Sequence, residues 1–150
     1  MADDLLDRLE AALREASRQL NRITRARLAE FELTLPRFYA LKMVGHCGVL
    51  TMSALQERLG LAPSTVTELV DDLVEAGLVI RERSHEDRRV VTVALTPAGK
   101  RVMARLGRYR REALAQAAAG MTEEKLQALV RDLTLLAEAL DRLAGSADGG

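Results

Sequence analysis

The chain has 150 residues, of which 48% are hydrophobic and 3% aromatic, with no tryptophan and one cysteine. Its 22 basic and 22 acidic residues give a formal net charge of +0, so overall charge does not indicate a nucleic-acid partner, and the scarcity of aromatic rings argues against stacking on unpaired bases. No apolar run reaches the roughly 18 residues of a membrane span, and the acidic start is unlike a signal peptide. The single cysteine excludes an internal disulfide, as expected in a reducing compartment. We therefore expect one soluble cytoplasmic domain over residues 1–150 without a membrane partner.

The first predicted element is a long amphipathic helix over about residues 3–30. Apolar residues recur at helical spacing from Leu5 to Ile23, and neither Gly nor Pro interrupts the chain before Pro36. Beside this stripe lies a row of arginines that share one helix face, Arg14, Arg18, Arg22 and Arg25. This face is either a solvated surface or a contact for phosphate or an acidic ligand.

Three shorter helices follow, separated by closely spaced start and stop signals. Pro36 suits the first turn of a helix that ends near residues 45–48. Thr51 can cap a second helix that Gly60 ends, and Pro63 begins a third that runs through residue 75 to a stop at Gly77. Two short helices joined by a tight turn containing glycine make a candidate helix-turn-helix.

After Gly77 the pattern changes from helical to extended. Residues 78–83 and 88–95 are rich in β-branched side chains, and a polar tip at 84–87 separates them. This arrangement predicts a two-stranded hairpin.

The last part of the chain predicts two more helices. Thr96 and Pro97 open one that runs to about residue 119, and Gly120 ends it. Thr122 caps the final helix, whose leucines follow a near-heptad spacing before a polar, glycine-rich tail that we expect to fray. Such a seam needs another helix, within the chain or across a two-fold axis. We expect a homodimer through helices at about 3–30 and 97–144.

The ordered motifs between residues 50 and 100 resemble the multiple-antibiotic-resistance regulator (MarR) family. The resemblance is carried by the helix pair over residues 50–67, Leu73-Val74-Glu75-Ala76-Gly77-Leu78-Val79, Asp87-Arg88-Arg89, and Leu95-Thr96-Pro97-Ala98-Gly99. It implies a mainly α fold with a small β-hairpin wing, in which a winged helix-turn-helix module at about 36–96 is flanked by N- and C-terminal dimerisation helices. It also implies that the homodimer binds a pseudo-palindromic duplex operator, with the 63–75 helix in the major groove and the 84–89 wing tip at the neighbouring minor groove or its phosphates. Small ligands of the family usually bind between the two parts.

The helix over 63–75 has an apolar face and a polar face. The inward set is Val66, Leu69, Val70 and Leu73, and the outward set, which we expect to contact DNA, is Ser64, Thr65, Thr67 and Glu68. Ser64 and Thr65 could instead only cap first-turn amides. In the wing, the residues expected to contact DNA are Arg81, Arg83, His85, Arg88 and Arg89. Asp87 is expected to orient a wing arginine by bidentate pairing.

The expected recognition helix departs from the family pattern in its charge and its start. Glu68 stands where a basic residue is common, the acidity continues in Asp71, Asp72 and Glu75, and Ala62 supplies no capping oxygen. Carboxylates near phosphates repel them, so we expect the DNA affinity to be concentrated in the wing. The alternative is a winged-helix protein-interaction module with weak or lost DNA binding.

No pattern typical of catalysis is found in the sequence. His46 and Cys47 are neighbours, but no second Cys/His pair with metal-ligand spacing exists, so we expect no enzyme activity, no cofactor and no metal site, and we interpret Cys47 as a buried thiol. Tyr39 and His46 are candidate wall residues of an effector cavity between the second helix and the dimer helices, with Arg22 available to an aromatic or acidic ligand. Alternatively, Tyr39 and His46 only complete helix packing, which is the simpler interpretation. The preferred function is a repressor released from DNA by a small molecule.

Overall fold

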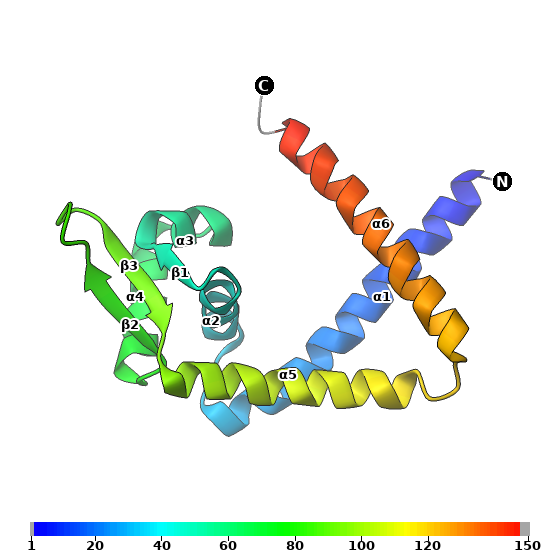
Figure 1. Ribbon diagram of the computed structural model, residues 1–150, viewed down its shortest axis with the longest axis horizontal. Helices are drawn as coiled ribbons and strands as arrows, with labels where there is room; N and C mark the ends of the chain where they lie inside the picture. The colour runs from blue at the N-terminus through cyan, green and yellow to red at the C-terminus, as the bar shows by residue number, and fades with distance from the viewer. Residues whose placement is uncertain (1, 148–150) are drawn as a thin grey trace. The chain divides into compact units, whose positions relative to one another are not determined.

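The computed structural model describes residues 2–147, which form a mainly helical fold with a small antiparallel sheet (Figure 1). This is the predicted fold class. The elements are α1 (Ala2–Leu28), a 3-10 turn η1 (Ala29–Phe31), α2 (Leu35–Cys47), β1 (Val49–Thr51), α3 (Met52–Leu59), α4 (Pro63–Glu75), β2 (Val79–Arg83), β3 (Val91–Leu95), α5 (Pro97–Ala117) and α6 (Glu123–Ala147). The chain forms two compact units that meet after Arg111, inside α5. None of the helices within residues 2–147 has both the length and the apolar content of a membrane span.

The sheet has three strands rather than the two of the predicted hairpin. Its order is β1-β3-β2, with both neighbouring pairs antiparallel (Figure 1). Ala94 of β3 pairs with Ile80 on one side and with Val49 on the other. The additional strand, β1, follows α2 through Gly48, whose φ of +81° is a conformation that glycine adopts without strain. The wing is defined here as β2, β3 and residues 84–90 between them.

Local capping explains why α3 and α4 begin and end where they do. The Thr51 hydroxyl accepts a hydrogen bond from the Ala54 amide (3.1 Å), and Gly60 ends α3 in the left-handed conformation with φ +62°. Ala62 gives α4 no side-chain cap, so Pro63 at the first helical position sets the start of the helix. The bounds of both helices confirm the prediction.

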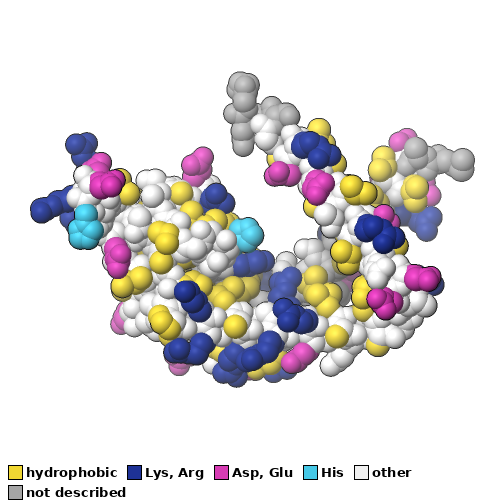
Figure 2. All heavy atoms as spheres, viewed as in Figure 1, with side chains coloured by type: hydrophobic (Ala, Val, Ile, Leu, Met, Phe, Trp, Pro, Cys, Tyr) yellow, Lys and Arg dark blue, Asp and Glu magenta, His cyan; other side chains and the backbone are white. Residues whose placement is uncertain are grey.

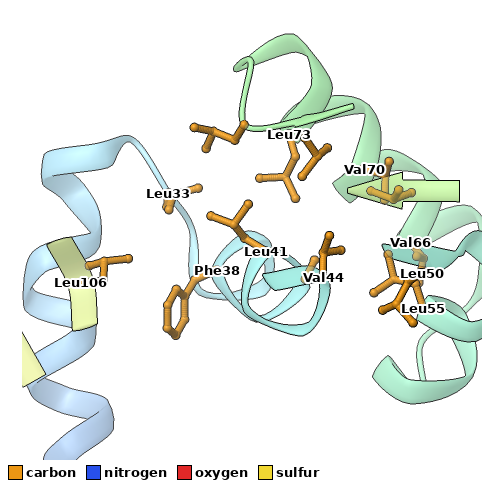
Figure 3. Packing of buried hydrophobic residues seen from close by; sticks show 14 of the residues in the cluster. Leu33, Phe38, Leu41, Val44, Leu50, Leu55, Val66, Val70, Leu73 and Leu106 are labelled. Carbon is orange, nitrogen blue, oxygen red and sulfur yellow. The ribbon is translucent and has the colours of Figure 1, made fainter. Parts of the chain in front are cut away.

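The apolar core of the first unit fixes α4 against α2, α3 and the sheet. Figure 3 shows apolar side chains of all of these elements converging. The fully buried members of the core include Leu41, Leu55, Val66, Leu73 and Val93. Burying a side chain of this size contributes about 1.5–3 kcal/mol, so this core is the main force that positions α4.

Polar contacts join the end of α1 to α5. The Glu30 carboxylate accepts hydrogen bonds from Arg27 (2.9 Å) and from the Tyr109 hydroxyl (3.0 Å), and these bonds, the one from Arg27 first, hold the pKa of Glu30 below its usual value. In addition, Arg110 of α5 donates to the hydroxyl of buried Thr24 in α1 (3.2 Å). These contacts connect α1 to the helix that leaves the wing.

The start of α5 is held closely against the start of β2. The Thr96 hydroxyl donates to the Gly77 carbonyl (2.6 Å) and accepts from the Gly99 amide (3.1 Å). Gly99 lies so close to Leu78 that an added Cβ would be 2.1 Å from the Leu78 carbonyl oxygen. This contact explains the glycine in the Thr-Pro-Ala-Gly motif.

The terminal helices each carry leucines that remain exposed in the single chain. On α1 the Leu5 side chain is 64% exposed, and on α6 Leu143 is 68% exposed. The Thr122 hydroxyl caps α6 by accepting from the Lys125 amide (3.3 Å), as predicted. α6 continues to Ala147, three residues beyond the predicted end at 144, because Gly145 is accommodated within the helix; the rest of the glycine-rich tail, where fraying was predicted, lies outside the described residues.

Candidate nucleic-acid interface

The two faces of α4 separate as predicted. The four apolar residues of the inward set are buried, while Ser64, Thr65, Thr67 and Glu68 are exposed. All four exposed residues lie in the first two turns, the part of a recognition helix that reaches base edges.

The hydroxyl groups of α4 have different hydrogen bonds. Thr67 donates to the Pro63 carbonyl (2.9 Å), so its proton is already used, and it can offer a base only its acceptor lone pairs and its methyl group. Neither Ser64 nor Thr65 accepts a first-turn amide among residues 2–147. The hydroxyls of Ser64 and Thr65 are therefore available to a ligand. The alternative, in which they cap the amides of the first turn, does not match this geometry.

Backbone hydrogen bonds shape the wing tip. The Ser84 amide donates to the Val90 carbonyl (2.8 Å) and the Val90 amide to the Asp87 carbonyl (2.9 Å). The Asp87 carboxylate accepts from the Arg89 amide through Oδ1 (3.0 Å), and Nε of Arg89 lies 3.9 Å from the same oxygen. Within residues 2–147 Asp87 therefore forms no bidentate pair with a guanidinium, and the prediction of such a pair is wrong; its carboxylate holds the backbone of Arg89 instead.

Arginine and histidine side chains project from the wing into solvent. The Arg89 side chain is 94% exposed, and Arg83, His85 and Arg88 are also exposed. Figure 2 shows basic, acidic and histidine side chains gathered at this end of the molecule. Arg81 differs, because its guanidinium forms an ion pair with Asp71 of α4. Among the described residues, four of the five wing residues proposed to contact DNA are thus exposed and form no ion pair with α4.

Two of the four α4 carboxylates are paired inside the module. Asp71 binds Arg81 of β2, and Asp72 binds Arg37 of α2. The expectation that all of these carboxylates repel phosphate needs correction, because a count of charges along the sequence ignores pairing. Glu68 is the carboxylate that remains unpaired in the N-terminal half of α4 among the described residues.

A notch with polar and apolar walls lies where α3, α4 and the wing meet. We call it the wing notch; it has a volume of about 380 Å³ and is lined by Thr51, Met52, Ser53, Gln56, Thr67, Arg81, Arg89, Val90 and Val91. The Arg89 guanidinium and the Ser53 hydroxyl are groups that suit an anion such as a backbone phosphate, whereas Arg81 is already paired with Asp71 and the Thr67 proton is bound to Pro63. Sequence reasoning missed Ser53 and Gln56, although their place in the first turns after the Thr51 cap, beside the recognition helix, could have indicated them.

A second cavity lies between α2 and the end of α3. This α2 pocket has a volume of about 600 Å³ and is lined by Pro36, Tyr39, Lys42, Met43, His46, Arg58, Leu59 and Leu61. It brings Tyr39 and His46 together, as predicted for an effector cavity, but α3 rather than a dimer helix forms the opposite wall. Lys42 and Arg58 are cations that the sequence analysis missed. Helical spacing could have found Lys42, which lies three residues after Tyr39 and four before His46.

Arg22 lies elsewhere. It lines an open groove of about 570 Å³ on α1 together with Arg14, Ser17, Arg18, Gln19, Asn21 and Arg25. Arg18 forms an ion pair with Glu15 (2.7 Å), which raises the pKa of Arg18 and lowers that of Glu15. The structure therefore does not bring Arg22 to the pocket that holds Tyr39 and His46.

Within residues 2–147 no three metal-ligating side chains form a cluster. Cys47 is a free, half-buried thiol at the end of α2. Neither feature adds chemistry to the interface.

Comparison with known proteins gives consistent matches. A model of the MarR family matches residues 33–91. The HTH-type transcriptional repressor IacR of Pseudomonas putida is 30% identical over 116 residues, which cover 77% of this chain and 70% of that protein. The structure of a MarR family protein from Bacillus stearothermophilus is 30% identical with a TM-score of 0.84, over 94% of this chain and 99% of that one. Streptococcus pneumoniae FabT, solved in complex with DNA, is 24% identical with a TM-score of 0.75, over 92% and 99% of the two chains.

Proposed function

Because this chain belongs to the MarR family of DNA-binding transcriptional regulators, which are not enzymes, we propose that it is a dimeric cytoplasmic repressor that binds a pseudo-palindromic operator and releases it when a small molecule binds. One observation carries the proposal: Thr67, from the exposed face of α4, lines the wing notch together with Arg81 and Arg89 of the wing. Groups for reading bases and groups for holding phosphates thus share one surface.

Two further observations support a dimer and a repressor. The exposed leucines of α1 and α6 form apolar faces that a second copy of the chain would cover, and a two-fold axis would present two recognition helices to two half-sites. IacR, which matches this chain over 116 residues, is a transcriptional repressor. A dimer that occupies an operator blocks other proteins from the same DNA.

The alternative is a protein-interaction module that has lost DNA binding. Its main support was the acidity of the recognition helix, and pairing of Asp71 and Asp72 with arginines weakens that support. Light scattering at micromolar concentration should give the mass of a dimer, and a gel shift with the protein's own upstream DNA should give a retarded band. A monomer, or a dimer that retards no duplex, would favour the alternative.

Glu68 provides a test of base reading. In the major groove its carboxylate can accept a hydrogen bond from cytosine N4, so Glu68→Gln is expected to weaken operator binding by about 1–3 kcal/mol. Binding to unrelated duplexes should strengthen slightly, because one negative charge is removed. Fluorescence anisotropy with both duplexes measures the two effects.

Glu75→Gln is the matched control for Glu68→Gln, because Glu75 is the last residue of the same helix and lies outside the DNA-facing turns. It should change neither affinity by much. If Glu68→Gln strengthens binding to the operator and to unrelated DNA equally, Glu68 only repels phosphate and reads no base.

The α2 pocket suits a small aromatic acid, since its apolar wall is flanked by Lys42, His46 and Arg58. A panel of phenolic and aromatic acids should contain a ligand that raises the melting temperature and releases DNA. A ligand at a hundred times its Kd adds about 2.7 kcal/mol to stability. Arg58→Met should weaken its binding about tenfold, the loss expected for one charge-assisted hydrogen bond.

Arg22→Met is the control for this ligand experiment, because Arg22 lines the α1 groove instead. If Arg22→Met abolishes the melting-temperature shift while Arg58→Met leaves it unchanged, the ligand binds on α1. A panel in which no compound shifts the melting temperature or releases DNA would count against an effector of this class.

A further inference from the structure

Two arginines from different elements form ion pairs with neighbouring carboxylates in the third turn of α4. Arg37, in the first turn of α2, donates to Asp72 Oδ2 through Nε (3.2 Å) and Nη2 (2.6 Å). Arg81, on β2, donates to Asp71. Successive residues of a helix point about 100° apart, so the two carboxylates leave α4 in different directions. The helix is therefore held from two sides.

These ion pairs are too exposed to be a major source of stability. The side chains of Arg37 and Asp72 are 33% and 42% exposed, and water screens such pairs effectively. The apolar core already holds the inward face of α4. Apolar contacts have little directional preference, whereas a guanidinium bound to a carboxylate fixes the rotation of the helix about its own axis. Orientation is thus the property that the two pairs can control.

The pairs also change the charge that α4 presents to a duplex. α4 has four carboxylates and no basic side chain, so an unpaired α4 would repel phosphates strongly. With Asp71 and Asp72 neutralised, the unpaired carboxylates of α4 among residues 2–147 are Glu68 and Glu75, and Glu75 is at the far end of the helix. A recognition helix of this composition therefore depends on arginines supplied by its neighbours.

We propose that Arg37 is a positioning residue for DNA recognition, which, opposite the Arg81–Asp71 pair, fixes the orientation of α4 through Asp72 and removes the charge of Asp72 from the DNA-facing surface. The proposal rests on the proposed DNA-binding function. It does not require Arg37 to touch DNA.

Four variants test it: Arg37→Met, Asp72→Asn, the exchanged pair Arg37→Asp with Asp72→Arg, and the control Arg101→Met, an exposed arginine of α5 without an ion pair among residues 2–147. Arg37→Met should weaken operator binding about three- to tenfold, in the range of coupling within a salt-bridge network, and the exchanged pair should recover most of the loss. Asp72→Asn should weaken binding less, because it removes a repelling charge together with the pair. Arg101→Met should match the wild type.

Two further readouts separate positioning from other roles. The slope of log affinity against log salt should not change in Arg37→Met, whereas loss of a phosphate contact would lower it by about 0.9 for each contact. Amide hydrogen exchange should be faster in the third turn of α4 in Arg37→Met than in Arg101→Met, with or without DNA.

Unchanged operator affinity in Arg37→Met would overturn the proposal, and if its melting temperature were lower at the same time, the ion pair would serve stability alone. A lower salt slope would also overturn the proposal, because it would show that Arg37 contacts a phosphate. If the wild type binds no duplex, the proposed function fails, and hydrogen exchange alone then decides the positioning role: unchanged exchange in α4 would refute it.

Discussion

Replacing Arg88 and Arg89 together with alanine is expected to weaken binding to every duplex by about a hundredfold or more at physiological salt. Both side chains are exposed at the wing tip, and Arg89 is held there through its backbone bond to Asp87. A dimer would lose up to four phosphate contacts, and each contact contributes a slope of about 0.9 in log affinity against log salt, or roughly a fivefold change at 0.15 M salt. Anisotropy titrations over a series of salt concentrations measure both quantities.

Arg101→Ala is the matched control for the wing variants, because it removes an exposed arginine from α5 instead of the wing. It should leave affinity and salt slope near their wild-type values. A double wing variant that binds with unchanged affinity and slope would show that the wing does not hold the phosphates, and the protein-interaction alternative would then gain support.

Gly99→Ala is expected to lower the free energy of unfolding by about 3 kcal/mol or more. The added Cβ would lie 2.1 Å from the Leu78 carbonyl oxygen and 3.1 Å from its carbon, so either α5 or the start of β2 must move. The obstacle is backbone, which cannot rotate away as a side chain can, and the Leu78 carbonyl also accepts the Thr96 amide (3.0 Å). Urea denaturation at one fixed protein concentration measures the loss.

Gly107→Ala, in the same helix, is expected to raise the free energy of unfolding instead of lowering it. Nothing lies within 4 Å of a Cβ added at Gly107, and alanine favours a helix over glycine by about 0.5–1 kcal/mol, so this variant should be slightly more stable than the wild type. If Gly99→Ala and Gly107→Ala unfold at the same urea concentration, the close contact between α5 and Leu78 does not limit stability.

Local signals in the sequence predicted the parts of the fold that depend on neighbouring residues. Thr51, Gly60 and Pro63 act within one helical turn of their own position, so the bounds of α3 and α4 were predicted to the residue. β1 could not be predicted in the same way. Its three residues are too few to show a period, and it exists because it pairs with β3 more than forty positions later in the chain.

The same distinction between local and long-range interactions applies to the candidate site. Helical periodicity separated the buried and exposed faces of α4, since that pattern is a property of one helix. The partner of Asp72 is Arg37, 35 positions earlier, and no local rule connects the two residues. Similarly, the sequence analysis grouped Tyr39 and His46 correctly as wall residues of one cavity, but no local rule could show that Arg22 lines a different surface.

The most direct test of DNA recognition is the affinity of the wild-type protein for two duplexes, measured by anisotropy under the same salt conditions. One duplex carries a pseudo-palindrome from the protein's own upstream region, and the other has the same composition in scrambled order. A specific regulator should bind the first at least about a thousandfold more tightly, with two chains per duplex. Equal affinity for the two duplexes, or no binding to either, would contradict sequence-specific recognition by α4 and the wing.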